Sequence, residues 1–259
     1  MALGKPPARG SVSVRVLERA LDLLSALERA GRPMGVSELG RATGVPKATV
    51  QRLLSALEYR GLVQKDQARY HLGVGVVPLA RAFLSVNSVA SAARPVLEQL
   101  AISSGETVSL YTRNGRDRVV IARIESPYTV RVAERIGQRL PLHVGAAGVV
   151  LMAYMPREEI DRYLEGLGDI PLASGGVLSR DQVLARLERV RREGFAVSYG
   201  ERRAGVVAVS APIVRAGLGV VAAIGVSGPP ARMPPEKVEQ LTIEVRRAAG
   251  EVAEACRQF

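Results

Sequence analysis

Residues 36–72 read VSELGRATGVPKATVQRLLSALEYRGLVQKDQARYHL, and their spacing predicts a helix, a tight turn, a second helix and a short hairpin. Ser37 is expected to cap the first helix, which buries Leu39 and Ala42. Gly44 permits the left-handed backbone that a sharp turn needs. This order of elements is typical of a winged helix-turn-helix, so double-stranded DNA is the first ligand to consider.

The second helix of this stretch has clear start and stop signals. Pro46 suits its first position, and Gly61 is expected to end it in a left-handed cap. Its inward face carries four apolar residues: Val50, Leu53, Leu54 and Leu57. Residues 62–65 and 69–72 alternate as a two-stranded wing that turns at Asp66–Gln67.

The exposed beginning of the second helix carries side chains that suit base edges in the major groove. Arginine and lysine match guanine O6 and N7, glutamine matches adenine N6 and N7, and Ala48 suits a thymine methyl group. The candidate DNA contacts are Lys47, Ala48, Thr49, Gln51 and Arg52 on the helix and Lys65 and Arg69 on the wing. On the wing, Tyr70 is expected to face the core. The alternative is an ordinary solvated helix face.

The charge distribution favours a polyanionic partner. The chain of 259 residues has a net charge of +11, and residues 1–75 hold 12 of the lysines and arginines against 6 acidic residues. The basic excess is therefore densest around the helix-turn-helix, as attraction to phosphate requires. The single cysteine, Cys256, excludes an internal disulfide framework and fits a reducing cytoplasm. The first residues lack the hydrophobic core of a signal peptide, so 1–12 is interpreted as a flexible basic arm.

Two further helices flank the helix-turn-helix and its wing, and the first of them belongs to the predicted DNA-binding domain of residues 13–74. The first, over 13–30, has a wide apolar stripe formed by Val16, Leu17, Ala20, Leu21, Leu24 and Leu27. This stripe is broader than a three-helix unit needs, so its surplus is expected to pack against a second copy. Residues 75–89 resume helical spacing and are interpreted as a connecting helix.

The remainder of the chain, 90–259, predicts an antiparallel sensor domain of strands paired by hairpins and helices before, between and after them. The expected strands are 106–113, 118–126, 129–134, 195–199, 206–214 and 219–227. The expected helices are 95–103, with Pro95 near its start, then 146–154, 157–164, 180–193 and 236–257. Asn114–Gly115 is a strong hairpin signal between the first two strands.

Five motifs in order resemble the IclR family of bacterial transcriptional regulators. They are RALDLLSAL, PKATVQRLLSALEYRGLV, ARYHLGVGVVPLA, GQRLPLHVGAAGVVLMAYMP and VVAVSAPIVRAGLGVVAAIGVSGP, and together they span about residues 12–230. The resemblance implies an α+β chain in which an N-terminal winged helix-turn-helix is joined by a helix to a GAF-like antiparallel α/β effector-binding domain. It also implies dimers, often paired into tetramers.

The expected effector pocket lies where a glycine-containing loop meets the beginning of the helix 146–154. Free backbone N–H groups there suit an anion or a carbonyl oxygen, and tight packing of helix on sheet is the alternative. The candidate residues are His143, Val144, Gly145 and Ala146 beside this loop, and Ser198, Ala208, Gly225 and Ser227 at the late-strand positions that the resemblance implies. Small residues at Ala208 and Gly225 are expected to leave volume. Because few fixed charges occupy these positions, a partly apolar effector with one polar end is favoured over a dicarboxylate.

No catalytic, cofactor or metal pattern emerges from the sequence. The segment from Gly225 to Gly228 lacks the spacing of a nucleophile elbow, and His71 and His143 have no ligand partners at zinc spacing. We therefore expect a cytoplasmic homo-oligomeric regulator, a repressor, that binds an operator and responds to a small molecule. The rivals are a metabolic enzyme or ligand-binding module with a basic N-terminal DNA-associating arm, and a bare architectural DNA binder.

Overall fold

The computed structural model describes residues 12–86 and 88–256, so the expected basic arm falls almost wholly outside the described residues. The chain divides into two compact units, Met1–Val86 and Asn87–Phe259. Within the described ranges, no single helix is long and apolar enough to cross a membrane; only Val76–Leu84 and Val89–Ser104, taken together, pass that test.

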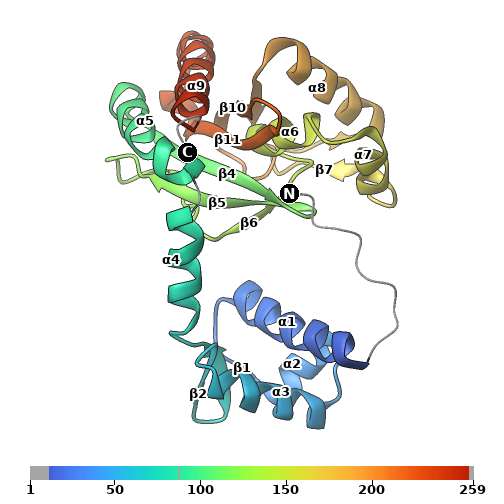
Figure 1. Cartoon of the computed structure of the whole chain (residues 1–259). Coiled ribbons are helices and arrows are strands. Elements are labelled where there is room, and N and C mark those ends of the chain that lie inside the picture. Colours follow the sequence, from blue (N-terminus) through green and yellow to red (C-terminus); the bar gives the residue numbers. More distant parts are fainter. Residues whose placement is uncertain (1–11, 87, 257–259) are drawn as a thin grey trace. The chain divides into compact units, whose positions relative to one another are not determined.

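The first unit is a helical domain with a small three-stranded sheet (Figure 1). Its elements are α1 (Val12–Ala30), β1 (Met34–Gly35), α2 (Val36–Thr43), α3 (Lys47–Tyr59), β2 (Val63–Asp66), β3 (Arg69–Leu72) and α4 (Val76–Val86). Strand β3 lies between β1 and β2, and both pairs are antiparallel. The largest fully buried side chains in its core are Leu23, Leu39 and Leu54, which come from α1, α2 and α3.

Three local predictions in this unit are wrong. Residue Ser37 does not cap α2, because β1 runs directly into the helix and Gly35 is the residue before its first turn. Ala42 is exposed, whereas Leu39 is buried as expected. The wing turns at residues 67–68, one position later than predicted, because Asp66 pairs with Arg69 across the hairpin.

The end of α3 confirms the predicted glycine cap. Gly61 has φ +69°, its N–H donates to the Glu58 carbonyl over 2.8 Å, and the Leu62 N–H donates to the Leu57 carbonyl over 2.9 Å. These two bonds form the motif that ends many helices in a left-handed residue. At the other end, Pro46 directly precedes α3 instead of being its first residue.

Three glycines form a junction between the end of α3, the end of the wing and the beginning of α4. The N–H of Gly75 donates to the Gly61 carbonyl and that of Gly73 to the Leu62 carbonyl, each over 2.9 Å. A Cβ placed on Gly73 or Gly75 would lie less than 3.0 Å from the Gly61 carbonyl oxygen. Main chain therefore packs directly on main chain at this junction, which is possible only without side chains.

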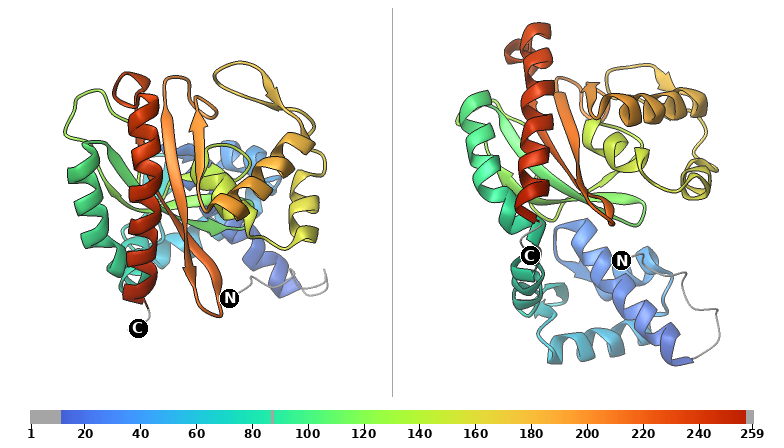
Figure 2. Two further views of the ribbon diagram at one scale, coloured as in Figure 1. Left: turned by 90° about the horizontal axis from the view of Figure 1, so that it is seen from above. Right: turned by 45° about the horizontal axis from the view of Figure 1, so that its top comes forward.

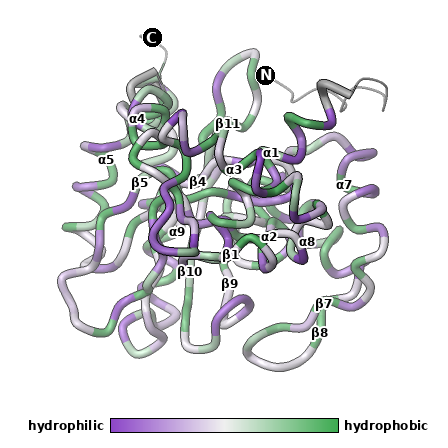
Figure 3. Tube along the Cα trace, turned by 90° about the horizontal axis from the view of Figure 1, so that it is seen from below, coloured by the Kyte–Doolittle hydropathy of each residue, from purple (hydrophilic) through white to green (hydrophobic). Residues whose placement is uncertain are grey.

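Helices α1 and α4 expose apolar side chains. Green and purple segments alternate along α1 in Figure 3, as expected of an amphipathic helix. The exposed apolar residues are Val16, Leu17 and Leu21 on α1 and Val77, Leu79, Phe83 and Leu84 on α4. The connecting helix is shorter than predicted, because α4 ends at Val86 and the next helix begins at Ser88.

The second unit is a six-stranded antiparallel sheet covered by helices on both faces (Figures 1 and 2). The strand order is β6-β5-β4-β11-β10-β9. The strands are β4 (Thr107–Asn114), β5 (Asp117–Ile124), β6 (Arg139–Pro141), β9 (Ala196–Tyr199), β10 (Val207–Arg215) and β11 (Gly219–Gly228). Helices α5 (Ser88–Ser104) and α9 (Pro235–Ala255) cover one face, and α6 (Ala146–Ala153), α7 (Arg157–Leu164) and α8 (Arg180–Glu193) lie on the other.

The two faces of the sheet have separate apolar cores, because side chains alternate along each strand. Leu110 and Ile224 pack towards α5 and α9, whereas Tyr111 and Val120 pack towards α6. The short helix α6 is buried along its whole length. This arrangement places the beginning of α6 against the middle of the sheet.

Two predictions for this unit are corrected by the structure, which also contains one hairpin that the sequence did not predict. Residues 129–134 alternate like a strand but pair with no strand, and β6 at Arg139–Pro141 takes the place beside β5. Pro95 lies inside α5, which begins seven residues earlier than expected; its ring is tolerated on an exposed side of the helix. A small hairpin of β7 (Ile170–Pro171) and β8 (Val177–Leu178) was not anticipated.

Candidate functional site

Helix α3 presents a polar surface at its beginning because its apolar residues are held inward. Val50, Leu53 and Leu54 are buried in the core of the first unit. The structure leaves Lys47, Ala48, Gln51 and Arg52 exposed and Thr49 half-buried. These five side chains form the α3 surface, and all five are among the candidate DNA contacts named from the sequence.

The wing confirms the predicted orientation of Tyr70 and qualifies that of Arg69. Tyr70 is buried, and the Lys65 ammonium lies 5.8 Å from the centre of its ring. Arg69 is exposed, but its guanidinium donates to the Pro33 carbonyl over 3.0 Å and lies 3.6 Å from a Glu38 carboxylate oxygen. Lys65 is therefore the freer of the two cations to meet a phosphate.

A pocket in the second unit lies where the beginning of α6 meets the inner face of the sheet. Six of the eight predicted effector residues line it: Gly145, Ala146, Ser198, Ala208, Gly225 and Ser227. Its free volume is about 40 Å³, and about 10–15 Å³ of such volume admits one water molecule. A roomier hollow of about 270 Å³ beside α8 is lined by none of the eight.

The other two predicted residues, His143 and Val144, do not line this pocket. The Nδ1 of His143 lies 2.8 Å from the Tyr163 hydroxyl, so this histidine has a structural partner. Burial, followed by the nearby charges of Arg118 and Arg116, lowers the pKa of His143 below its ordinary value of 6.5. The Val144 carbonyl accepts a hydrogen bond from Arg118 over 2.8 Å.

Gly225 does not leave the open volume that the sequence suggested. A Cβ there would lie less than 3.0 Å from the hydroxyl oxygen of Ser210, the residue opposite it on β10. The space above Gly225 is therefore taken by the Ser210 side chain, which itself lines the pocket.

The expectation of few fixed charges in the pocket is wrong. Its lining includes five charged side chains, Arg118, Glu134, Glu201, Arg202 and Arg203. Glu134 forms an ion pair with Arg202 and accepts a 2.7 Å hydrogen bond from the Tyr111 hydroxyl. Burial and the Glu134 charge raise the pKa of Tyr111 above its ordinary value of 10.0, so the phenol remains a donor.

Arg118 differs from the other charged residues of the pocket in its burial and in its hydrogen-bond partners. It is only 3% exposed, and its Nη1 donates to the carbonyls of Pro141 and Val144 while its Nε has no hydrogen-bond partner. No ion pair joins it to a carboxylate among the residues that the structure describes. Burial lowers its pKa, because a guanidinium without a counter-ion is disfavoured away from water.

The beginning of α6 is already occupied by side-chain oxygens. The Glu201 carboxylate accepts from the Gly145 N–H over 2.8 Å, and the Ser198 hydroxyl accepts from the Ala146 N–H over 3.1 Å. Glu201 also pairs with Arg186 of α8. This helix terminus therefore accepts an anionic side chain of the protein itself. Packing is also tight here, since a Cβ on Gly148 would lie less than 3.0 Å from Leu142 and Arg118.

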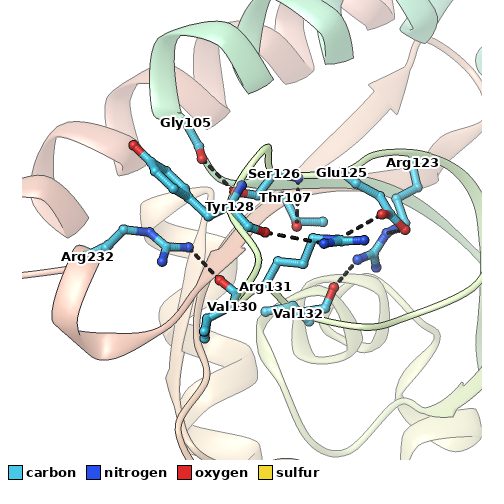
Figure 4. Close-up of polar contacts among 10 residues, drawn as sticks. All are labelled: Gly105, Thr107, Arg123, Glu125, Ser126, Tyr128, Val130, Arg131, Val132 and Arg232. Carbon is cyan, nitrogen blue, oxygen red and sulfur yellow. Dashed lines mark hydrogen bonds and ion pairs between the residues drawn. The ribbon is translucent and has the colours of Figure 1, made fainter.

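One side of the pocket is formed by the loop of residues 125–138, which contributes Val132 and Glu134. Arginines hold this loop through its main chain: Arg123 donates to the Val132 carbonyl, and Arg232 donates to the Val130 carbonyl over 3.0 Å (Figure 4). The Arg232 guanidinium also lies 4.3 Å from the centre of the Tyr128 ring. The carbonyls that a strand neighbour would satisfy are thus taken by arginines, which explains why 129–134 forms no strand.

Sequence reasoning missed Tyr111, Arg118, Glu134, Glu201 and Arg202. Two of them lie on β4 and β5, and three lie in loops, so no spacing rule brings them together. The one available signal was Arg118 at the beginning of an apolar strand, where a charge on the inward face requires a purpose. The described residues contain no group of three or more metal-ligating side chains.

Comparison with known proteins gives consistent matches for both units. Residues 16–67 match the IclR helix-turn-helix domain, and residues 81–254 match the domain described as bacterial transcriptional regulator IclR C-terminal. The HTH-type transcriptional regulator KipR of Bacillus subtilis is 32% identical over 219 residues, covering 84% of this chain and 88% of KipR. The HTH-type transcriptional repressor AllR of Escherichia coli K12 is 30% identical, covering 93% of this chain and 90% of AllR.

Solved structures show the same architecture. An IclR-type transcriptional regulator from Silicibacter sp. TM1040 has a TM-score of 0.85 at 28% identity and covers 93% of this chain and 96% of its own. An IclR homologue from Microbacterium hydrocarbonoxydans, solved with 4-hydroxybenzoate, has a TM-score of 0.76 over 94% of this chain and 100% of its own. At 21% identity, this second likeness shows the fold alone.

Proposed function

The chain belongs to the IclR family of bacterial transcriptional regulators and is a DNA-binding regulator, not an enzyme; from that premise, we propose that the α3 surface reads its operator and that the α6 pocket holds its effector. The observation that carries the first half is the exposed polar beginning of α3 above a fully apolar buried face. In a helix-turn-helix, the second helix enters the major groove with its N-terminal residues against the bases.

The candidate DNA contacts fall into groups according to the part of the DNA that each side chain suits. Gln51 and Arg52 suit bidentate contacts with adenine and guanine, and Lys47 and Thr49 supply further donors at the same helix end. Lys65 and Arg69 contact phosphate from the wing, with Arg69 exchanging its present partners for DNA. Ala48 contacts a thymine methyl group.

Effector control rests on the pocket. A closed site with backbone donors, hydroxyls and an unpaired cation is built to orient a small molecule. Effector binding changes operator affinity only through a difference in affinity between two states of the regulator. Since the AllR relatives are named repressors, we propose repression that the effector relieves.

We also propose a homodimer formed through the exposed apolar faces of α1 and α4, with a tetramer as the larger assembly. A dimer presents two recognition helices to half-sites spaced by whole turns of DNA. The functional parts are then a basic arm at 1–12, a DNA-binding domain at 13–74, a linker at 75–89 and an effector domain at 90–259. Because its proposed partner is a chromosomal operator, we propose that the protein acts in the cytoplasm.

Selection of DNA tests the reading surface. Full-length protein is used to enrich binding sequences from a random double-stranded library, and we expect one motif to emerge. Arg52→Ala and Gln51→Ala should each weaken binding to that motif by about 1–3 kcal/mol, and binding to random DNA should change less. Arg60→Ala, an exposed arginine at the far end of α3, is the matched control. Failure to enrich any sequence, or equal losses on motif and random DNA, contradicts base reading by α3.

A further inference from the structure

Glu201 is an acidic side chain placed inside the effector pocket by the protein itself. It lies just after β9, in the segment that leads to β10, and its side chain is only 9% exposed. One carboxylate oxygen accepts from the Gly145 N–H, and the other pairs with Arg186. Its carboxylate thus fills part of a pocket whose remaining free volume, about 40 Å³, is too small for a metabolite.

The position of this carboxylate is one that favours an anion. The N–H groups of Gly145 and Ala146 point from the first turn of α6, where the helix dipole favours negative charge. The guanidinium Nη2 of Arg118 lies 3.0 Å from the place that a Cβ on Gly145 would occupy. Arg118 is therefore a buried cation directed at the same helix terminus.

The charges of the pocket do not balance without a further anion. Glu134 is neutralised by Arg202, and Glu201 is neutralised by Arg186. Arg118 remains without a carboxylate among the described residues: its Nη1 donates to two main-chain carbonyls, and its guanidinium lies 5.6 Å from the centre of the Tyr111 ring. A buried guanidinium in this situation is stabilised by any carboxylate that can approach it.

We propose that Glu201 is an internal placeholder for the carboxylate of an acidic effector, which displaces it from Gly145 and pairs with Arg118. This inference rests on the proposed effector pocket and adds a group of the chain itself, the Glu201 carboxylate, that competes with the carboxylate of the effector. The apolar part of the effector lies over Val206, which also lines the pocket. Displacement frees Glu201 together with its neighbour Arg202, whose ion pair with Glu134 joins this segment to the loop of residues 125–138. Effector binding thus opens a contact between two loops.

Acetate and its uncharged isostere acetamide test the placeholder directly on the full-length protein. Binding of ¹³C-labelled acetate is measured by NMR titration in the wild type, in Glu201→Ala and in Glu201→Gln. Removing the tethered carboxylate in Glu201→Ala should tighten acetate binding at least about tenfold, a ratio that corresponds to about 1.4 kcal/mol. Glu201→Gln keeps the space filled and should show no such gain, and acetamide should bind no better to any variant.

The variant Arg186→Gln provides a second, independent test, because it leaves the Glu201 side chain itself in the pocket. It removes the anchor of Glu201 from the surface of α8, so the tethered carboxylate competes less well and acetate binds more tightly than in the wild type. Equal acetate affinity in the wild type, Glu201→Ala and Arg186→Gln would overturn the proposal, as would the absence of acetate binding in every variant. Enrichment of a DNA motif by the same preparations is scored separately, so failure of the placeholder is distinguishable from failure of the regulator function.

Discussion

Two helical glycines should respond in opposite directions to the same substitution. Alanine is favoured over glycine inside a helix by about 0.8–1 kcal/mol. At Gly250 of α9, an added Cβ meets nothing within 4 Å, so Gly250→Ala should raise the free energy of unfolding by about 0.5–1 kcal/mol. At Gly148 of α6, the same Cβ would lie less than 3.0 Å from the Leu142 carbonyl oxygen and the Arg118 Nη1.

Neither of these neighbours can move cheaply, because one is main chain and the other is held by two carbonyls. Overpacking costs about 1–3 kcal/mol, and here the contacts are severe, so the net loss for Gly148→Ala should reach about 1–3 kcal/mol after the helix gain. A loss of this size lowers Tm by about 2–4 °C for each kcal/mol in a protein of this size.

Urea unfolding followed by far-ultraviolet circular dichroism measures both variants against the wild type. The midpoint should move down for Gly148→Ala and up for Gly250→Ala, with the slope m unchanged. If Gly148→Ala proved as stable as the wild type, the close approach of α6 to the segment before it would be refuted, and with it the placement of the pocket wall.

Two other predictions concern assembly and pH. Leu21→Asp on α1 and Phe83→Asp on α4 should each convert the proposed dimer to monomer in sedimentation at micromolar concentration. The control Tyr59→Asp, at a more exposed aromatic side chain on α3, should not. A wild type that sediments as a monomer would contradict the dimer. The pKa of His143 is lowered in the folded state, so as the pH falls the unfolded chain takes up a proton before the folded protein does. The stability due to this residue is therefore intact above about pH 6.5 and declines as the pH falls towards the native pKa. His143→Gln should therefore show a shallower loss of unfolding free energy between about pH 7 and 5, and an unchanged slope would argue against the half-buried histidine.

Elements with local signals were predictable from sequence. Helices α7 and α8 have the predicted bounds, and α8 begins with a capping box in which Ser179 and Gln182 each satisfy the other's main-chain N–H. Gly194 ends α8 in the left-handed conformation. These signals lie within a few residues of the helix they control, so a single sequence suffices to locate them.

Features that depend on distant partners could not be predicted. The two-residue strand β1 exists only through its pairing with β3, and 129–134 loses its strand character to Arg123 and Arg232. Ser198, Ala208 and Ser227 became candidates through the family resemblance, and the alternation of side chains along β9, β10 and β11 places them together on the pocket face of the sheet. Glu201 and Arg118 were missed because only the folded sheet brings a loop carboxylate and a strand guanidinium to the same helix terminus.

The three-glycine junction at Gly61, Gly73 and Gly75 has a mechanical consequence. Side chains between packed elements can change rotamer and absorb small movements, but here main chain touches main chain and is hydrogen-bonded across the contact. The end of α3, the end of the wing and the beginning of α4 therefore turn as one rigid piece. A rotation imposed on α4 therefore turns the axis of α3 with it. In the proposed dimer, the orientation of α4 would then set the distance between the two α3 surfaces.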